Sequence, residues 1–184
     1  MKQWYSMLES AKQFYYQSGY TGIGDWITEN DFYVTIYNFH GLRSNVGGRV
    51  KEIGSNRMRL RNNVSQEKLN IYYAHEAAHL GGYTEAGAYA ITAALLGSRG
   101  KLSVLRSLMR EIKKDPSLKS KLPKEFKELY ENMFTKEGID PSASDTFYNA
   151  YQQWGKNILT DFSSSNNNEN DDDSWWDEYD PSKR

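Results

Sequence analysis

The sequence predicts an α+β fold, in which a small antiparallel sheet is followed by a mainly helical C-terminal half. Two observations support this class. Runs rich in aromatic and β-branched residues, which are typical of strands, fall within residues 31–61. Beyond residue 65, apolar residues recur every three or four positions, which is the spacing of amphipathic helices. Strands thus come before most of the helices rather than alternating with them, as α+β proteins require.

The N-terminal region is expected to begin with a helix. Apolar side chains recur at helical spacing over residues 2–17, and Gly19 follows as a stop signal. The next segment, GYTGIGD (residues 19–25), is rich in glycine and is expected to be a loop. DFYVTIYNF (residues 31–39) is the strongest strand pattern in the chain, because almost every residue favours extended backbone.

Two weaker strand patterns follow. A short strand is expected near Val50, inside a segment dominated by turn residues. RMRLR (residues 57–61) alternates basic and apolar side chains, which predicts a strand with one exposed face. Its charges favour a place at the edge of the sheet, where they would discourage pairing with other chains.

A pair of helices should follow the strands. Ser65 is a suitable N-cap for a helix that runs to about Leu80, where two consecutive glycines break it. Thr84 can cap the next helix, with Glu85 favourably placed at its positive end. Three more helices are expected beyond residue 100: one that stops before Pro116, one from Pro123 to about Gly138, and one that carries the apolar residues of 147–158.

The chain divides into a body and a tail. Residues 1–162 fit a single domain that is large enough to bury its own core. Residues 163–184 are polar, low in complexity and acidic, and are expected to be disordered. The tail has two basic and seven acidic side chains, whereas the body has a net charge of +4. The sequence contains no cysteine, so any metal must be held by histidine and carboxylate.

Composition also limits the partners and the compartment. No apolar run is long enough to span a membrane, and the N-terminus lacks the apolar core of a secretory signal. A cytoplasmic location is expected, or export as a toxin module by a route without a signal peptide. Nucleic acid is not an expected partner. Residues 99–124 hold nine basic and two acidic side chains, but no aromatic residue interleaves with them, so a solvated helix face is expected.

The motif HEAAH (residues 75–79) carries the most chemistry. Residues four apart on an α-helix lie about 40° apart around the axis and about 6 Å apart along it. His75 and His79 would therefore project from one face and could reach the same metal ion. Glu76 lies beside the first histidine, where it could act as a general base on a metal-bound water.

A catalytic zinc needs a third protein ligand, and Glu85 is the candidate. It lies six residues after His79, just beyond the glycine pair. A continuous helix would carry Glu85 about 9 Å up the axis from His79. A turn at the glycines lets the chain fold back toward the histidines.

The stretch HEAAHLGGYTE (residues 75–85) resembles the HExxH signature of the zincin metallopeptidases. It also matches the longer metzincin spacing HExxHxxGxxH, except that the last position holds Glu85 instead of histidine. If the roles of the metzincin residues apply to this chain, Gly82 is the turn residue and Glu85 is the third ligand. The methionine turn of metzincins has no clear counterpart, because Met109 and Met133 fall in expected helices. A glutamate ligand on a second helix is typical of gluzincins, so the chain resembles a compact zincin with mixed features.

The resemblance implies a zinc metallopeptidase, expected to be an endopeptidase, with Zn2+ as cofactor and a protein or peptide as substrate. Glu76 would be the catalytic base. Tyr83 and Tyr73 are candidates for the hydrogen-bond donor to the oxyanion, although packing is the commoner role for such tyrosines. The resemblance also implies that residues 57–61 lie beside the active-site helix, where an extended substrate can pair with a strand.

Other interpretations remain open. The histidines could be surface or core residues of an ordinary helix, or they could hold a zinc without catalysis. The chain could also be a catalytically inactive zincin-like binding module that acts through its basic helix and its acidic aromatic tail. WWDEY (residues 175–179) in that tail could recognise a protein partner or dock on the oppositely charged body, although a tail that only solvates the protein is the default interpretation.

Overall fold

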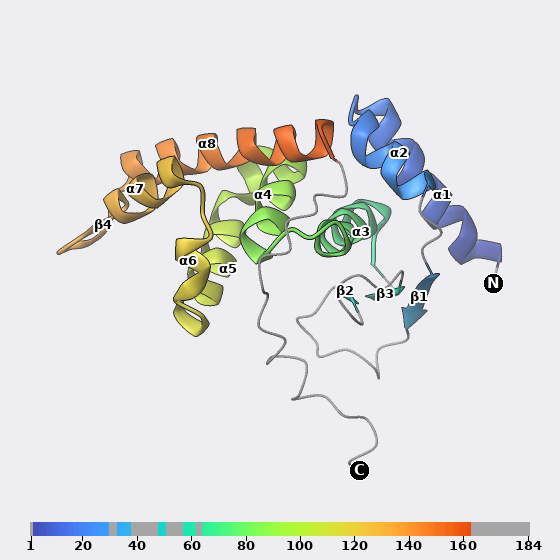
Figure 1. Ribbon diagram of the computed structural model, residues 1–184, viewed down its shortest axis with the longest axis horizontal. Coiled ribbons are helices and arrows are strands. Elements are labelled where there is room, and N and C mark those ends of the chain that lie inside the picture. Colours follow the sequence, from blue (N-terminus) through green and yellow to red (C-terminus); the bar gives the residue numbers. More distant parts are fainter. Residues whose placement is uncertain (1, 30–32, 38–47, 51–56, 62–63, 163–184) are drawn as a thin grey trace, which may run out of the picture.

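The computed structural model describes residues 2–29, 33–37, 48–50, 57–61 and 64–162 (Figure 1). Within these ranges the strands β1 (Tyr33–Tyr37), β2 (Gly48–Val50) and β3 (Arg57–Arg61) form one small sheet, and most of the remaining chain is helical. The expected α+β class is therefore confirmed. The acidic tail, residues 163–184, lies outside the described residues.

The sheet differs from expectation in two respects. β3 lies between β1 and β2, and it pairs parallel with β1 and antiparallel with β2, so the sheet is mixed rather than antiparallel. The prediction of an edge position for residues 57–61 is also wrong. Met58 and Leu60 are buried, whereas Arg59 and Arg61 on the other face are half-buried. The alternating charges thus mark the outer face of a one-sided sheet, which a central strand also has.

The N-terminal helix α1 (Lys2–Gln17) is confirmed, but the loop expected after it is wrong. Residues Thr21–Glu29 form a second helix, α2. Its buried side chains Ile23, Trp26 and Ile27 follow helical spacing, and their burial outweighs the low helix propensity of the glycines.

The two helices at the centre of the molecule begin and end as expected. α3 (Gln66–Leu80) is capped by Ser65, whose hydroxyl oxygen accepts a hydrogen bond from the Lys68 N–H at 3.3 Å. α4 (Glu85–Leu96) follows Thr84, although the Thr84 side chain makes no capping hydrogen bond. The helices are joined by a turn of four residues, 81–84.

The C-terminal half consists of helices and one hairpin. Its elements are η1 (Gly97–Gly100), α5 (Lys101–Lys114), α6 (Ser117–Ser120), α7 (Lys124–Asn132), β4 (Phe134–Thr135), β5 (Gly138–Ile139) and α8 (Pro141–Thr160). The helix after Pro123 is therefore shorter than expected. Gly138 has a φ of 128°, and it lies in a hairpin that pairs Phe134 with Ile139 rather than at a helix end.

α4 is the central helix, because it packs on α3, α5 and α8. The contact with α8 is very close. A Cβ atom on Gly155 of α8 would lie 1.9 Å from the carbonyl oxygen of Ala90, so only glycine allows this approach. α4 is thereby held between α8 and the histidine-bearing helix α3 (Figure 1).

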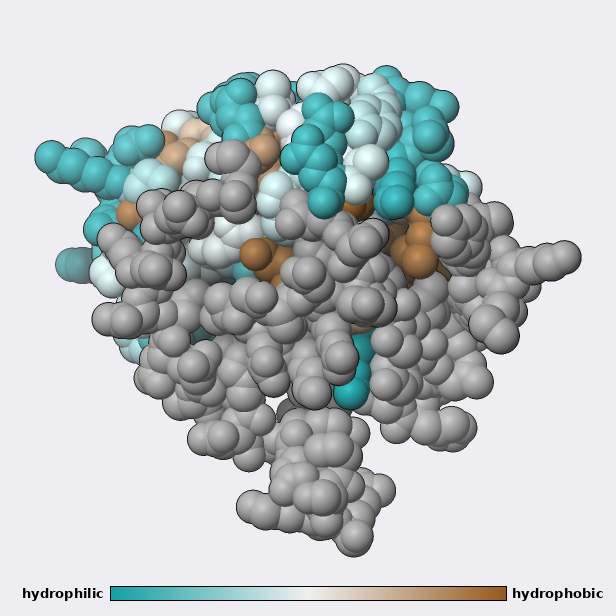
Figure 2. All heavy atoms as spheres, turned by 45° about the vertical axis from the view of Figure 1, so that its right-hand side comes forward, coloured by the Kyte–Doolittle hydropathy of each residue, from teal (hydrophilic) through white to brown (hydrophobic). Residues whose placement is uncertain are grey.

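The coloured surface in Figure 2 is largely hydrophilic along the upper part of the molecule, and apolar atoms show in small separate places. None of the described helices combines the length and the apolar character needed to cross a lipid bilayer.

Candidate metal centre

His75, His79 and Glu85 meet at the junction of α3 and α4. Each residue offers one ligand atom, and these three atoms lie within 4.8 Å of one another. The Nε2 atom of His79 lies 3.1 Å from Glu85 Oε1, and the Nε2 atom of His75 lies 3.4 Å from Glu85 Oε2. The expected return of Glu85 to the histidines is therefore present in the fold. This group could hold a metal ion.

The turn between the helices explains how Glu85 returns. The N–H groups of Gly81 and Tyr83 donate to the carbonyl oxygens of Ala77 and Ala78, each at 2.9 Å, so they close the end of α3. Gly82 has a φ of 87°, a left-handed conformation that favours glycine. The chain then reverses, and Glu85 becomes the first residue of α4.

The outer ring nitrogen of each histidine has a hydrogen-bond partner. His79 Nδ1 lies 3.0 Å from the carbonyl oxygen of Tyr83, which can only accept a hydrogen bond. His75 Nδ1 lies 3.3 Å from the hydroxyl oxygen of Thr92. That hydroxyl also donates to the Ala88 carbonyl at 3.2 Å. Both partners thus favour a hydrogen on Nδ1, which leaves the Nε2 lone pair of each neutral ring facing Glu85.

Such an arrangement requires a cation. Two imidazole lone pairs and a carboxylate repel one another unless a proton or a metal ion lies between them. Oε2 of Glu85 is buried, and it has no hydrogen-bond partner among the described residues. A metal ion bound by all three side chains would satisfy this atom. Imidazole nitrogen and carboxylate oxygen are both common ligands of divalent transition metals, so the residues fit a metal.

The pKa values of His79 and Glu85 show that the site favours a positive charge beside the carboxylate. Burial opposes charging of His79, but the adjacent Glu85 carboxylate outweighs this effect and raises the pKa of His79 to about 9. Burial likewise opposes ionisation of Glu85, yet His79 and His75 hold its pKa well below the usual range. A proton can therefore occupy the place that a metal ion would take.

Glu76 lies on α3 beside the metal-binding group. It is buried, with 6% of its surface exposed, and its negative charge contributes to the raised pKa of His79. Strand β2 lies directly against it. A Cβ atom on Gly48 would be 2.8 Å from Cγ of Glu76. The strand can therefore lie so close to the Glu76 side chain only because residue 48 is glycine.

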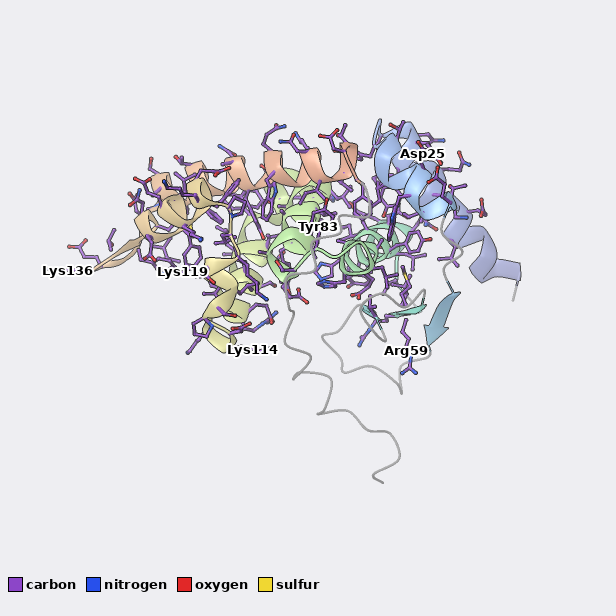
Figure 3. The ribbon with its side chains drawn as sticks, viewed as in Figure 1. Asp25, Arg59, Tyr83, Lys114, Lys119 and Lys136 are labelled. Atoms are coloured by element: carbon purple, nitrogen blue, oxygen red, sulfur yellow. The ribbon has the colours of Figure 1, made fainter. Side chains whose placement is uncertain are left out.

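The two tyrosines considered as oxyanion donors lie elsewhere. Tyr83 is at the turn between α3 and α4 (Figure 3), and its ring packs against Phe162 with centroids 5.5 Å apart. Its backbone carbonyl, rather than its hydroxyl, reaches the site. Tyr73 is buried, and the nearby carboxylate that helps raise its pKa is Glu9 of α1. No hydrogen bond of either hydroxyl to the metal-binding group is present among the described residues.

Two residues of α4 that were not predicted belong to the site. The ring of Tyr89 lies edge-on to His75 with centroids 5.0 Å apart, and Thr92 contacts His75 Nδ1. The signal was present in the sequence, because Glu85, Tyr89 and Thr92 are spaced four and three residues apart and so share one helix face.

Comparison with known proteins found no match to this chain among family models, curated proteins or solved structures. The roles of the residues therefore follow from the chemistry of this site.

Proposed function

We propose that this chain is a zinc-dependent peptidase whose metal is held by His75, His79 and Glu85. The observation that supports this function is the convergence of two imidazole Nε2 atoms on a buried carboxylate oxygen that lacks a hydrogen-bond partner. Two nitrogen ligands and one carboxylate, with a coordination position left for water, are typical of catalytic zinc in metallopeptidases. The resemblance of residues 75–85 to the zincin signature supports the same assignment.

Zinc, when bound, supplies a Lewis acid that makes a water molecule more acidic and polarises the substrate carbonyl. Glu76 is the candidate to accept the proton of that water at its carboxylate, because it follows His75 on α3, its charge acts on His79, and it is shielded from bulk solvent. It then donates this proton to the nitrogen of the leaving amine. The hydroxyl of the water ends on the acyl carbon, so one water is consumed for each peptide bond broken.

Tyr89 is a better candidate than Tyr83 for the donor that stabilises the oxyanion. Its ring lies against His75, and the charge of Glu85 contributes to raising its pKa, after the larger effect of burial. The phenol therefore keeps its proton at neutral pH and can donate a hydrogen bond. The ring of Tyr83 instead packs on Phe162, and it is the backbone carbonyl of Tyr83 that contacts His79.

The substrate is proposed to lie along β2 rather than along residues 57–61. β3 is paired on both sides, whereas β2 is at an edge of the sheet among the described residues. β2 is also the strand that touches Glu76. An extended peptide that pairs with this edge would bring its backbone carbonyl close to the general base.

Substitution of the base tests this function. The full chain, loaded with zinc, is compared with Glu76→Gln and with Glu67→Gln, a control at an exposed position of the same helix, on an unfolded protein substrate. Glu76→Gln is expected to keep its zinc and to lose at least about 100-fold in rate, because the amide cannot accept the proton. Cleavage by the wild type and by Glu76→Gln at equal rates would contradict the proposal, as would zinc-loaded wild type that cleaves no unfolded substrate.

A further inference from the structure

The polar side chains of α4 are few and gather at one place. Apart from alanine, glycine and aliphatic residues, α4 contains only Glu85, Tyr89 and Thr92. Each of them contacts a histidine of α3: Glu85 contacts both, and the other two contact His75. All three are half-buried on the face of α4 that meets the histidines, so the contacts that each makes there indicate what its polar group does.

We infer that Thr92 is a positioning residue, which orients His75 and fixes its tautomer for metal binding. This inference rests on the proposed zinc site and adds a residue that the site requires. The hydroxyl of Thr92 has one hydrogen, which it donates in a hydrogen bond to the Ala88 carbonyl oxygen at 3.2 Å. Its oxygen can therefore only accept from His75 Nδ1, at 3.3 Å. The hydrogen of the neutral imidazole is thus held on Nδ1, and Nε2 is left as the ligand atom.

A hydrogen bond from threonine to the carbonyl four residues earlier is common in helices, and by itself it assigns no role. Thr28, Thr146 and Thr160 of this chain make the same bond. What distinguishes Thr92 is the second contact, because of these four threonines it is the one whose oxygen also meets a histidine. The contact joins two helices across 17 residues of sequence.

The two histidines are therefore oriented in different ways. His79 donates to a backbone carbonyl, that of Tyr83, within the turn that follows its own helix. His75 depends on a side chain of the neighbouring helix, so its orientation relies on the packing of α4 against α3. Removal of the Thr92 hydroxyl should leave His75 free to rotate or to place its hydrogen on Nε2, where it would block the metal.

The test compares Thr92→Val, Thr92→Ser and the control Thr146→Val with the wild-type chain. Valine keeps the shape but removes the hydroxyl, serine keeps the hydroxyl, and Thr146 is an exposed threonine that makes the same helix hydrogen bond. The zinc dissociation constant is measured by competition with a chelating dye. Thr92→Val should weaken binding by about 10-fold or more, the effect usual for the loss of such a partner, whereas the other two variants should lie within about 2-fold of wild type.

A second measurement uses the wild type alone, so it does not require any variant to fold. Nitrogen-15 NMR of the zinc-loaded wild type should show His75 bound to the metal through Nε2, with its hydrogen on Nδ1. A hydrogen on Nε2 would overturn the inference, and so would Thr92→Val that binds zinc as tightly as wild type. Failure of the wild type to bind zinc would instead contradict the proposed function, which is therefore tested separately from the role of Thr92.

Discussion

At the scale of single residues, His79 and Glu85 are the most strongly coupled pair in the site. Their ligand atoms are 3.1 Å apart, and each holds the other in its charged form despite burial. This coupling has a direct consequence for metal binding. A zinc ion must displace the proton from His79, whose pKa of about 9 keeps it protonated at neutral pH.

Zinc affinity is therefore expected to rise with pH. Below about pH 9 the metal-free site carries the His79 proton, so each unit of pH from 6.5 upward should tighten binding by about 10-fold until the pKa is reached. The measurement is a series of zinc titrations by competition at fixed ionic strength. Glu85→Gln is the matched control, because it removes the charge that raises the pKa. Affinity that does not change between pH 6.5 and 9 would show that His79 is not a ligand.

The metal-free protein should show the opposite trend in stability. The folded pKa of His79 lies above its unfolded value near 6.5, so the stabilisation by its charged form is complete below pH 6.5 and is lost as pH rises through about 9. The midpoint of thermal unfolding, measured in the presence of a chelator, should fall over this interval. In the Glu85→Gln variant the fall should be smaller, and an equal fall in both chains would assign it to other groups.

At the scale of elements, the positions of α3 and α4 decide the chemistry, and β2 completes it. Glu76 lies between its own helix and the strand, because Gly48 leaves no side chain in the way. A Cβ atom at residue 48 would also lie 3.0 Å from Leu60 Cδ2 and 3.1 Å from the Arg59 carbonyl oxygen. The strand can make room for it only by moving away from the helix, or by displacing Glu76.

Gly48→Ala is expected to lower the peptidase rate without loss of zinc. A shift of the base by about 1 Å can reduce the rate by up to about 100-fold, whereas none of the three atoms nearest to a Cβ at residue 48 belongs to a metal ligand. The measurements are kcat and zinc content. Gly138→Ala is the control for a general loss of stability, since a φ of 128° strains alanine although a Cβ there meets nothing within 4 Å, and the hairpin carries no residue of the site. Equal rates in wild type and Gly48→Ala would contradict the role of β2.

Helix boundaries were more predictable from the sequence than strand pairing. Ser65 and the glycine pair gave α3 its correct start and end, because capping and turn signals act within a few residues. The order of the strands depends on contacts between distant segments, which local patterns do not contain. The same reason explains why His75, Glu76 and His79 were recognised and Thr92 was not: its spacing from Glu85 places it on the same helix face, but its contact with His75 depends on the packing of α4 on α3.

At the scale of the whole molecule, ion pairs between elements account for part of the basic segment 99–124. Arg99 pairs with Glu67 of α3, Lys101 with Asp145 of α8, and Lys119 with Glu131 of α7. Exposed pairs of this kind stabilise a fold only slightly, but they do compensate charge. These three residues thus fit the expected solvated face better than a surface for an anionic partner.

The contact between α4 and α8 is expected to support the metal centre from a distance. Gly155→Ala would place a Cβ against the backbone of Ala90 and force the helices apart, which should lower the free energy of unfolding by about 1–3 kcal/mol. Since α4 carries Glu85 and Thr92, zinc affinity should fall as well. Urea denaturation and zinc titration measure the two effects. Asn149→Ala, at an exposed position of α8, should change neither, and a Gly155→Ala variant of unchanged stability would contradict the observed packing.

The central claim is that His75, His79 and Glu85 together hold a zinc ion, and zinc titration of the full chain tests it most directly. Wild type is expected to bind one zinc tightly. Glu85→Ala, which removes one of the three ligands, should weaken that binding by about 100-fold or more, whereas Glu67→Ala on the exposed face of α3 should not change it. A wild-type chain that binds no zinc, or a Glu85→Ala chain that binds it unchanged, would contradict the claim.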